Sequence, residues 1–183
     1  ILSDKRFVLG NNLFHWCVIM LLSAHFVGLL TPEALYKSII SPHHKQILAM
    51  TAGGILGTIC WVGMTILVLR RLFNLRVRTN SRPSDIMILL VLYVQLMLGL
   101  STIHVSAKHL DGVDMEALAN WVQHIVTFRT DAYLYLQNIN IIFKIHLFVG
   151  MTLFVLFPFT RLVHIVSVPL QYLTRTGYQI VRK

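Results

Sequence analysis

The sequence contains few charged residues and very few acidic ones. Only 13% of its 183 residues are charged, and seven are Asp or Glu. Soluble globular domains usually carry about 25% charged residues, so the composition argues against that class. Hydrophobic residues instead make up 56% of the chain, and its mean hydropathy is +0.69. These values predict an integral membrane protein.

Cysteine is also scarce, since Cys17 and Cys60 are the only two. Both lie within apolar segments, and neither belongs to a Cys-x-x-Cys-His pattern, so a covalently attached c-type haem is not supported. We expect both to be buried apolar thiols. The chain begins with Ile1 and has no signal-peptide pattern before its first apolar segment. We interpret this as an incomplete N-terminus that a further helix would precede.

Four long apolar runs are present, at residues 7–31, 46–69, 85–105 and 138–160. Each is near or above the roughly 20 residues that a membrane-spanning helix needs. The runs are continuous rather than alternating, which favours helices over the strands of a membrane barrel. The sequence therefore predicts an all-α integral membrane protein with four visible transmembrane helices. We interpret residues 1–183 as a single transmembrane domain.

The segments between the runs are short, except for residues 106–137, which are more polar. We expect an amphipathic helix at the outer membrane surface over 115–128. Ser84 or Asp85 is expected to cap the third spanning helix. Pro158 lies inside the fourth run and is expected to kink or end its helix.

The basic residues are unevenly distributed. Segment 70–82 contains five arginines and no acid. Most of the acids lie in the loops on the opposite side: Glu33, Asp111, Asp114, Glu116 and Asp131. The positive-inside rule places segment 70–82 and both chain ends in the cytoplasm. We interpret the basic loop as an orientation signal that contacts anionic membrane lipid, and not as a nucleic-acid site.

Four histidines lie in the first and last apolar segments: His15, His25, His146 and His164. An imidazole in hydrocarbon is costly and indicates a function. Two per helix match two b-type haems, each held by two histidines. Because the first and fourth helices are antiparallel, His25 shares a depth with His146 on the outer side, and His15 with His164 on the inner side.

The spacing along the helices agrees only in part. Ten residues between His15 and His25 rise about 15 Å, whereas eighteen residues between His146 and His164 rise about 27 Å if fully helical. A break at Pro158 would shorten the second distance. Eighteen residues at about 100° each bring His146 and His164 to the same helix face.

Other interpretations of the histidines stay open. Each could be a hydrogen-bonded core residue, and together they could relay protons in a haem-free anchor or transporter. Zinc is less favoured, because no intramembrane pair has the spacing that puts two ligands on one helical face. The remaining five are expected in loops or interfaces, in solvated roles: His43, His44, His104, His109 and His124.

Gly28 follows His25 by one turn, and Gly150 follows His146 by one turn. Small residues there could make room for a flat macrocycle. They could equally serve helix packing, which small residues also favour in membranes.

Longer motifs accompany the histidines. They include Asn-Leu-Phe-His at 12–15, Ala-His-Phe-Val-Gly-Leu-Leu-Thr-Pro at 24–32, Arg-Arg-Leu-Phe at 70–73, and the stretches 45–46, 52–54, 85–86, 126–128, 146–154, 156–169 and 172–175. On these residues the chain resembles the membrane cytochrome b (gamma) subunit of respiratory nitrate reductase. The similarity covers nearly the whole chain, and both histidine spacings agree.

The resemblance implies a five-helix, two-haem protein of the prokaryotic cytoplasmic (inner) membrane. It further implies that menaquinol or ubiquinol is oxidised near the outer haem. Electrons would then pass inward to an iron–sulfur subunit and a molybdenum-containing catalytic subunit, with residues 161–183 docking on a soluble partner. A related complex linked to sulfur, nitrite or heterodisulfide chemistry is the alternative.

Three cations are further candidates for the site. Lys45 matches a family lysine associated with quinol, and it lies at the expected outer end of the second helix. Snorkelling at a helix end is its ordinary role. Lys144 and Arg161 each lie within one turn of a candidate histidine and could pair with haem propionates. Anchoring at the membrane interface is the alternative for both.

Overall fold

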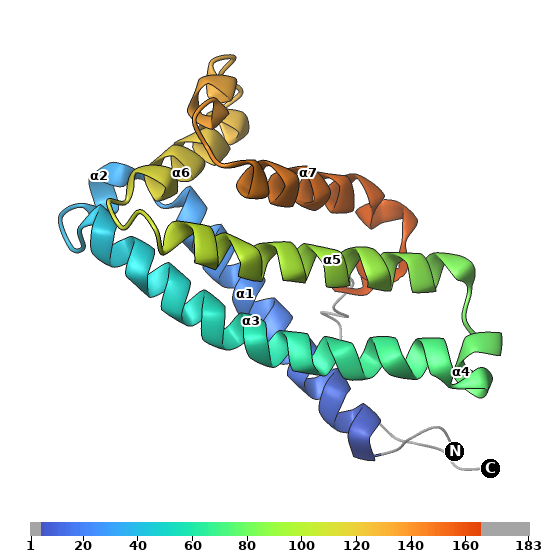
Figure 1. Ribbon diagram of the computed structural model, residues 1–183. Helices are drawn as coiled ribbons and strands as arrows, with labels where there is room; N and C mark the ends of the chain where they lie inside the picture. Colours follow the sequence, from blue (N-terminus) through green and yellow to red (C-terminus); the bar gives the residue numbers. More distant parts are fainter. Residues whose placement is uncertain (1–4, 166–183) are drawn as a thin grey trace, which may run out of the picture.

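The computed structural model describes residues 5–165, and four long helices dominate it (Figure 1). These are α1 (Lys5–Leu30), α3 (Pro42–Phe73), α5 (Pro83–Ser106) and α7 (Ile141–Leu156). All four are long and apolar enough to cross a membrane, α7 together with the turn that follows it. The described residues contain no strand. The predicted class, a multi-pass helical membrane protein, is therefore confirmed.

Shorter elements connect the long helices. They are α2 (Glu33–Tyr36), α4 (Leu75–Thr79), α6 (Val113–Val126) and the 3₁₀ helices η1 (Ala132–Leu136), η2 (Phe157–Phe159) and η3 (Arg161–Ile165). Figure 1 shows α2 and α6 at one end of the bundle and α4 at the other. The helix expected over 115–128 is present as α6, which begins and ends two residues earlier than expected.

Two helix starts differ from the expectation. Helix α3 begins at Pro42, four residues before its apolar run, because Ser41 accepts a hydrogen bond from the His44 backbone N–H and Pro42 occupies the first turn. Helix α5 begins at Pro83 with Arg82 at the cap position and no side-chain capping bond. The expected capping role of Ser84 or Asp85 is therefore wrong.

Pro158 ends the last spanning helix, as expected. Helix α7 stops at Leu156, η2 follows, and Thr160 has extended backbone angles, with φ −121° and ψ 170°. Proline cannot donate the N–H that would continue the helix. Because the helix is broken there, His146 and His164 do not lie on one continuous helix. The argument that eighteen residues bring them to one helical face is wrong.

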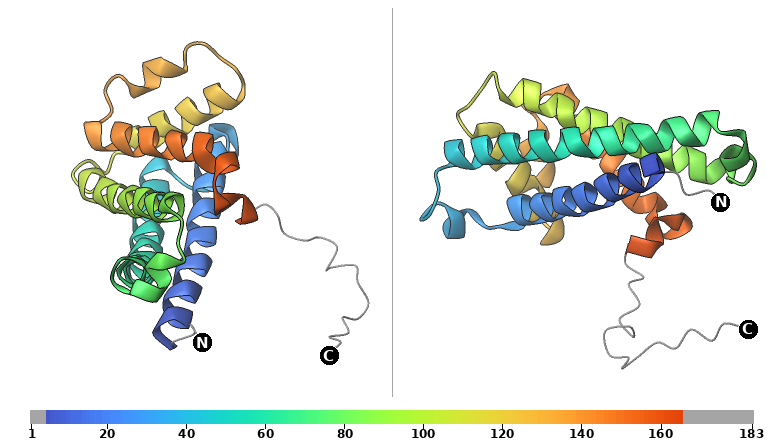
Figure 2. Two further views of the ribbon diagram at one scale, coloured as in Figure 1. Left: turned by 90° about the vertical axis from the view of Figure 1, so that its right-hand side faces the viewer. Right: turned by 90° about the horizontal axis from the view of Figure 1, so that it is seen from below.

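Glycines allow the long helices to pack closely. A Cβ atom on Gly63 of α3 would lie 2.8 Å from the Phe14 backbone nitrogen and 2.9 Å from the Gly10 carbonyl oxygen of α1. A Cβ atom on Gly57 would lie 2.7 Å from Leu100 of α5. Such close approaches between helices are typical of membrane helix interfaces. Helix α3 packs against both α1 and α5, and α5 packs against α7 (Figure 2).

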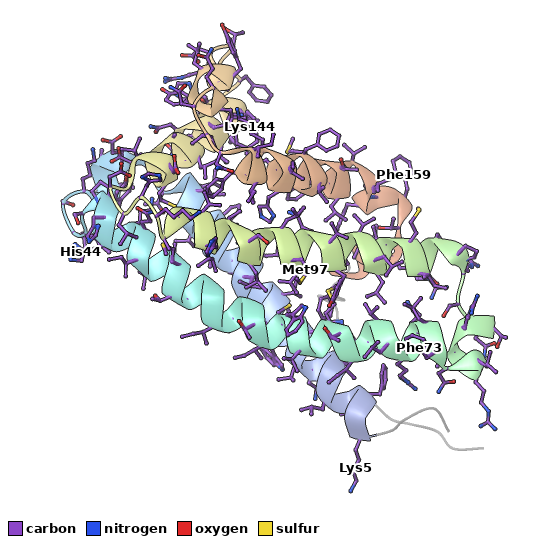
Figure 3. The ribbon with its side chains drawn as sticks, viewed as in Figure 1. Lys5, His44, Phe73, Met97, Lys144 and Phe159 are labelled. Atoms are coloured by element: carbon purple, nitrogen blue, oxygen red, sulfur yellow. The ribbon has the colours of Figure 1, made fainter. Side chains whose placement is uncertain are left out.

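The outer faces of the bundle are apolar. Trp16, Phe26 and Phe154 are each about 70% exposed, as expected for side chains that face lipid. Cys17 and Cys60 are buried, which confirms the expectation for both thiols. Figure 3 shows that His44 and Lys144 lie toward the end occupied by α2 and α6, and that Phe73 lies toward the other end.

Candidate functional site

The structure brings His25 of α1 and His146 of α7 together. Their ring centroids are 6.4 Å apart, and the ring planes are tilted by 43°. These histidines are 121 positions apart in the chain, so the contact depends on the antiparallel arrangement of the two helices. The proximity agrees with the pairing expected at the outer side, whereas their role as ligands stays a prediction.

The ring nitrogens of the α1 histidines have defined roles. Nδ1 of His25 lies 2.7 Å from the Leu21 carbonyl oxygen, and Nδ1 of His15 lies 2.8 Å from that of Asn11. A carbonyl oxygen can only accept, so Nδ1 carries the proton and the neutral ring has its lone pair on Nε2. Histidines that bind metals are usually oriented by such a bond from the other nitrogen.

The His25–His146 pair fits a metal held between two imidazoles. With metal–nitrogen bonds of about 2 Å, the two ring centroids would lie about 6 Å apart, close to the distance seen. Among the described residues, no group of three or more His, Cys, Asp or Glu side chains could hold a metal ion. A metal at this pair would therefore need further ligands from a cofactor, and the four nitrogens of a porphyrin would provide them.

Helix α5 forms one wall beside His146. A Cβ atom on Gly99 would lie 3.1 Å from Cε1 of the His146 ring, so only glycine fits there without displacing the ring. Nδ1 of His146 is buried without a hydrogen-bond partner, as is Oε1 of Gln95, one turn before Gly99 on α5. Sequence reasoning missed both α5 residues, because their helix carries none of the four candidate histidines.

The two glycines that are candidates to make room for a macrocycle face residues of neighbouring helices. A Cβ atom on Gly28 would make an ordinary contact of 3.8 Å with Met115 of α6. A Cβ atom on Gly150 would lie 3.0 Å from Nε2 of Gln95 on α5. Whether Gly28 and Gly150 also make room for a macrocycle stays a prediction.

The inner pair is described only in part. His15 is half-buried on α1, and its ring meets that of Phe14 edge to face, with centroids 5.2 Å apart. The side chain of His164 lies outside the described residues. The pairing of His15 with His164 therefore stays a prediction.

Lys45 is not at the exposed surface position expected for a snorkelling lysine. It is 8% exposed, and its Nζ lies 3.7 Å from the centroid of the Tyr36 ring. Nζ is buried and makes no hydrogen bond. The ammonium group therefore rests on an aromatic face, where cation–π attraction stabilises it. The sequence gives no sign that Tyr36 contacts Lys45, because this contact forms only when the turn at α2 brings the two residues together.

Lys144 and Arg161 have protein partners in the structure. Nζ of Lys144 donates to the Gln137 carbonyl oxygen at 3.1 Å. Nε of Arg161 lies 3.3 Å from Oδ1 of the buried Asp85, which joins the turn after α7 to the start of α5. Pairing of either cation with a propionate stays a prediction.

A polar cluster surrounds Tyr36 at the end of the bundle where α2 meets α6. The Tyr36 hydroxyl donates to Oε1 of Glu116 over 3.5 Å, and the same oxygen lies 3.2 Å from Nζ of Lys37. Lys37 also pairs with Glu33. Burial raises the pKa of Tyr36, and the negative charge of Glu116 raises that pKa further.

Two glutamines attach α6 to the spanning helices. The buried Gln46 donates to the carbonyl oxygens of Ser106 and His109 and accepts from the Gly112 N–H. Gln123 donates to the Leu29 carbonyl oxygen at 3.0 Å and to that of Thr31 at 3.2 Å. These bonds fix α6, and with it Glu116, against α1 and α3.

The opposite end of the bundle is basic. It contains α4 with Arg76 and Arg78, and Arg70 lies 3.9 Å above the Phe7 ring.

Neutral or apolar side chains line an open groove on α3, among them Met50, Gly54 and Ile55. Because that groove contains no titratable group, the histidine pair and the Lys45 region are the stronger candidate sites.

The fold and the histidine pair define a multi-pass helical membrane protein with a candidate metal-ligand pair between α1 and α7. Residues 1–183 match the family model described as nitrate reductase gamma subunit, and the chain belongs to that family. The resemblance seen in the sequence is thereby confirmed.

Individual relatives agree with this assignment. The chain is 47% identical over 181 residues to the respiratory nitrate reductase 1 gamma chain of Escherichia coli strain K12, a match that covers 99% of this chain and 80% of the relative. It is 46% identical over 180 residues to the respiratory nitrate reductase 2 gamma chain of the same strain, covering 98% and 79%. It is also 39% identical over 186 residues to the nitrate reductase gamma chain of Bacillus subtilis strain 168, covering 100% and 82%.

Proposed function

We propose that this chain is the dihaem cytochrome b subunit of a respiratory nitrate reductase, which oxidises membrane quinol near the outer face and sends the electrons inward. The observation that carries the proposal is the 6.4 Å separation of the His25 and His146 rings, which belong to two apolar helices of membrane-spanning length. Family membership supports it independently.

The histidines would hold the cofactors. His25 and His146 would bind the outer b-type haem, and His15 and His164 the inner one. The Nδ1 bonds to the Leu21 and Asn11 carbonyl oxygens orient the α1 imidazoles so that Nε2 offers its lone pair. When bound, a b-type haem supplies an iron that accepts and releases one electron at a time.

Lys45 would bind the quinol, either menaquinol or ubiquinol. Its ammonium group is buried and makes no hydrogen bond, so it can donate to an oxygen of an incoming ligand. The apolar surroundings strengthen such a charge-assisted bond and exclude water from it.

The partners would lie at the basic end of the bundle. With the arginines of α4 in the cytoplasm, this end and residues 161–183 would dock on an iron–sulfur subunit, which passes electrons to a molybdenum-containing catalytic subunit. The prokaryotic cytoplasmic membrane is the proposed location, with lipid around the apolar faces. The family membership favours nitrate reductase over a sulfur-, nitrite- or heterodisulfide-linked complex.

Redox difference spectra of purified histidine variants test the haem assignment. We expect His25→Ala and His146→Ala to remove the same b-type component, and His15→Ala and His164→Ala to remove the other. Absence of b-type bands from the unchanged protein would favour a haem-free anchor. Loss of one component in both His25→Ala and His164→Ala would refute the pairing.

Stopped-flow reduction of the haems by a quinol analogue tests Lys45. A hydrogen bond to a charged group contributes about 1.5–3 kcal/mol, so Lys45→Ala should weaken quinol binding roughly tenfold to a hundredfold. Dithionite, which needs no quinol site, should still reduce both haems fully. Lys108→Ala, which alters an exposed lysine after α5, is the matched control. Unchanged quinol kinetics in Lys45→Ala would refute the role.

A further inference from the structure

A series of polar side chains leads from Lys45 to Glu33, and their exposed fractions increase in that direction. Lys45 and Tyr36 are 8% and 7% exposed, whereas the side chain of Glu116 is 29% exposed. The side chains of Lys37 and Glu33 are each 44% exposed. Consecutive members are in contact, from the ammonium group on the Tyr36 ring to the two carboxylates that share Lys37. Tyr36 and the partly exposed Glu116 therefore connect the buried lysine to solvent, whereas Lys37 and Glu33 lie beyond this connection.

Quinol oxidation needs such a connection, because it releases protons as well as electrons. An ammonium group has no lone pair, so Lys45 can hold a quinol oxygen but cannot take its proton. Burial and the charge of Glu116 raise the pKa of Tyr36, so the phenol stays neutral. A neutral hydroxyl can still accept one proton while it donates another. Glu116 is the carboxylate that receives the Tyr36 hydrogen bond.

We propose that Glu116 is the proton acceptor for quinol oxidation at Lys45, with the Tyr36 hydroxyl as the relay between them. The inference rests on the proposed quinol function. It assigns the protons a route along α2 and α6, away from the histidine pair that would receive the electrons.

Each quinol loses two electrons and two protons: two O–H bonds break, and both oxygens become carbonyl oxygens. The two electrons would be taken up one at a time by the proposed b-type haems, which are the oxidants in the proposed function. For each proton, the Tyr36 hydroxyl accepts from the quinol and donates to Glu116, which then releases the proton to water at its exposed side.

The neighbours of Glu116 suit this role. Tyr36 and Glu33 face it from α2, Lys37 follows α2, and Lys45 lies on α3. On its own helix, Asp114 has a raised pKa because of burial and the nearby Asp111. Lys37 contacts the Glu116 oxygen that accepts from Tyr36, which holds the carboxylate in place. The Tyr36–Glu116 distance of 3.5 Å is long, as proton-transfer contacts often are before substrate binds.

Glu116→Gln tests the proposal, and Glu33→Gln is the matched control. Both changes remove a carboxylate that pairs with Lys37, but only Glu116 contacts Tyr36. The intact complex is reduced with a water-soluble naphthoquinol across neutral to alkaline pH, in light and heavy water. We expect Glu116→Gln to slow haem reduction by roughly a hundredfold, because general acid–base groups contribute about 10²–10⁴-fold. Glu33→Gln should stay within about twofold of the parent.

Further readouts separate proton transfer from a structural defect. Glu116→Gln should keep full haem reduction by dithionite and parental affinity for a non-reducible quinone analogue. Tyr36→Phe keeps the aromatic face under Lys45 but removes the hydroxyl, so it should reproduce the slow rate. A parental rate in Glu116→Gln, alongside slow reduction in Lys45→Ala, would overturn the proton route alone. Normal kinetics in Lys45→Ala would overturn the quinol function itself.

Discussion

Adding a side chain at Gly99 perturbs the histidine pair without removing either imidazole. A Cβ atom at this position lies 3.1 Å from Cε1 of His146, so alanine forces the ring back by a few tenths of an ångström. Valine adds two further methyl groups, and its stiff side chain cannot turn away within a helix. We therefore expect a graded displacement of His146 from its position opposite His25.

The expected magnitude follows from the cost of overpacking. Inserting methyl groups into a well-packed interior costs about 1–3 kcal/mol. If this free-energy cost destabilises the haem-bound form, the affinity of the His25–His146 pair for haem falls by roughly fivefold to 150-fold. Alanine should lie at the lower end of this range and valine at the upper end.

The assay is the haem-to-protein ratio of purified complex at limiting haem supply, with redox titration to separate the two b-type components. Gly53→Val is the matched control, because a Cβ atom at Gly53 of α3 has nothing within 4 Å. This control makes the same glycine-to-valine change within a helix, so it has the same effect on helix propensity, but it does not contact a histidine. A full complement of haem and parental potentials in Gly99→Val would refute the inference that α5 forms a wall of the site.

Three other expectations concern the outer end of the bundle. Gln46→Leu leaves its backbone partners without their bonds, so the free energy of unfolding should fall by roughly 2–5 kcal/mol, as measured by thermal unfolding in detergent. Glu116→Gln should lower the pKa of Tyr36, because it removes a negative charge that opposes phenolate formation. Burial should still keep this pKa above its ordinary value of 10.0. NMR titration of labelled tyrosine measures the change. The hydrogen bond from His124 lowers the pKa of Asp131. This bond therefore stabilises the fold fully above pH 3.8, and its effect is lost as the pH falls through the lower pKa that Asp131 has in the folded state. His124→Ala should return the pKa of Asp131 toward 3.8, as carboxyl NMR resonances would show.

Sequence patterns predicted the features that depend on periodicity and chain direction. Continuous apolar runs marked the spanning helices, and Pro158 marked the end of α7. The contact between His25 and His146 followed from two antiparallel helices of sufficient length. Each of these features can be predicted from a single segment, or from the fact that successive membrane-spanning helices run in opposite directions.

Features that depend on side-by-side packing could not be predicted. Gly99 is one of ten glycines, and its contact with His146 depends on the register between α5 and α7. The burial of Lys45 depends on the turn at α2, which folds Tyr36 beneath it. The expectation that His146 and His164 share a helical face was wrong, because it treated the chain as helical through Pro158.

The close contact of Gly10 with Gly63 has a mechanical consequence. A Cβ atom on either glycine would collide with the facing helix: one on Gly63 would lie 2.9 Å from the Gly10 carbonyl oxygen, and one on Gly10 would lie 2.9 Å from Cγ2 of Ile66. His15 and His25 belong to one uninterrupted rod, α1, about 15 Å apart along its axis. In the proposed dihaem arrangement, the two ligands from α1 would therefore keep a fixed separation along one continuous helix. A slip of α1 by one residue would shift both imidazoles together by about 1.5 Å, altering their depth in the membrane but not their spacing.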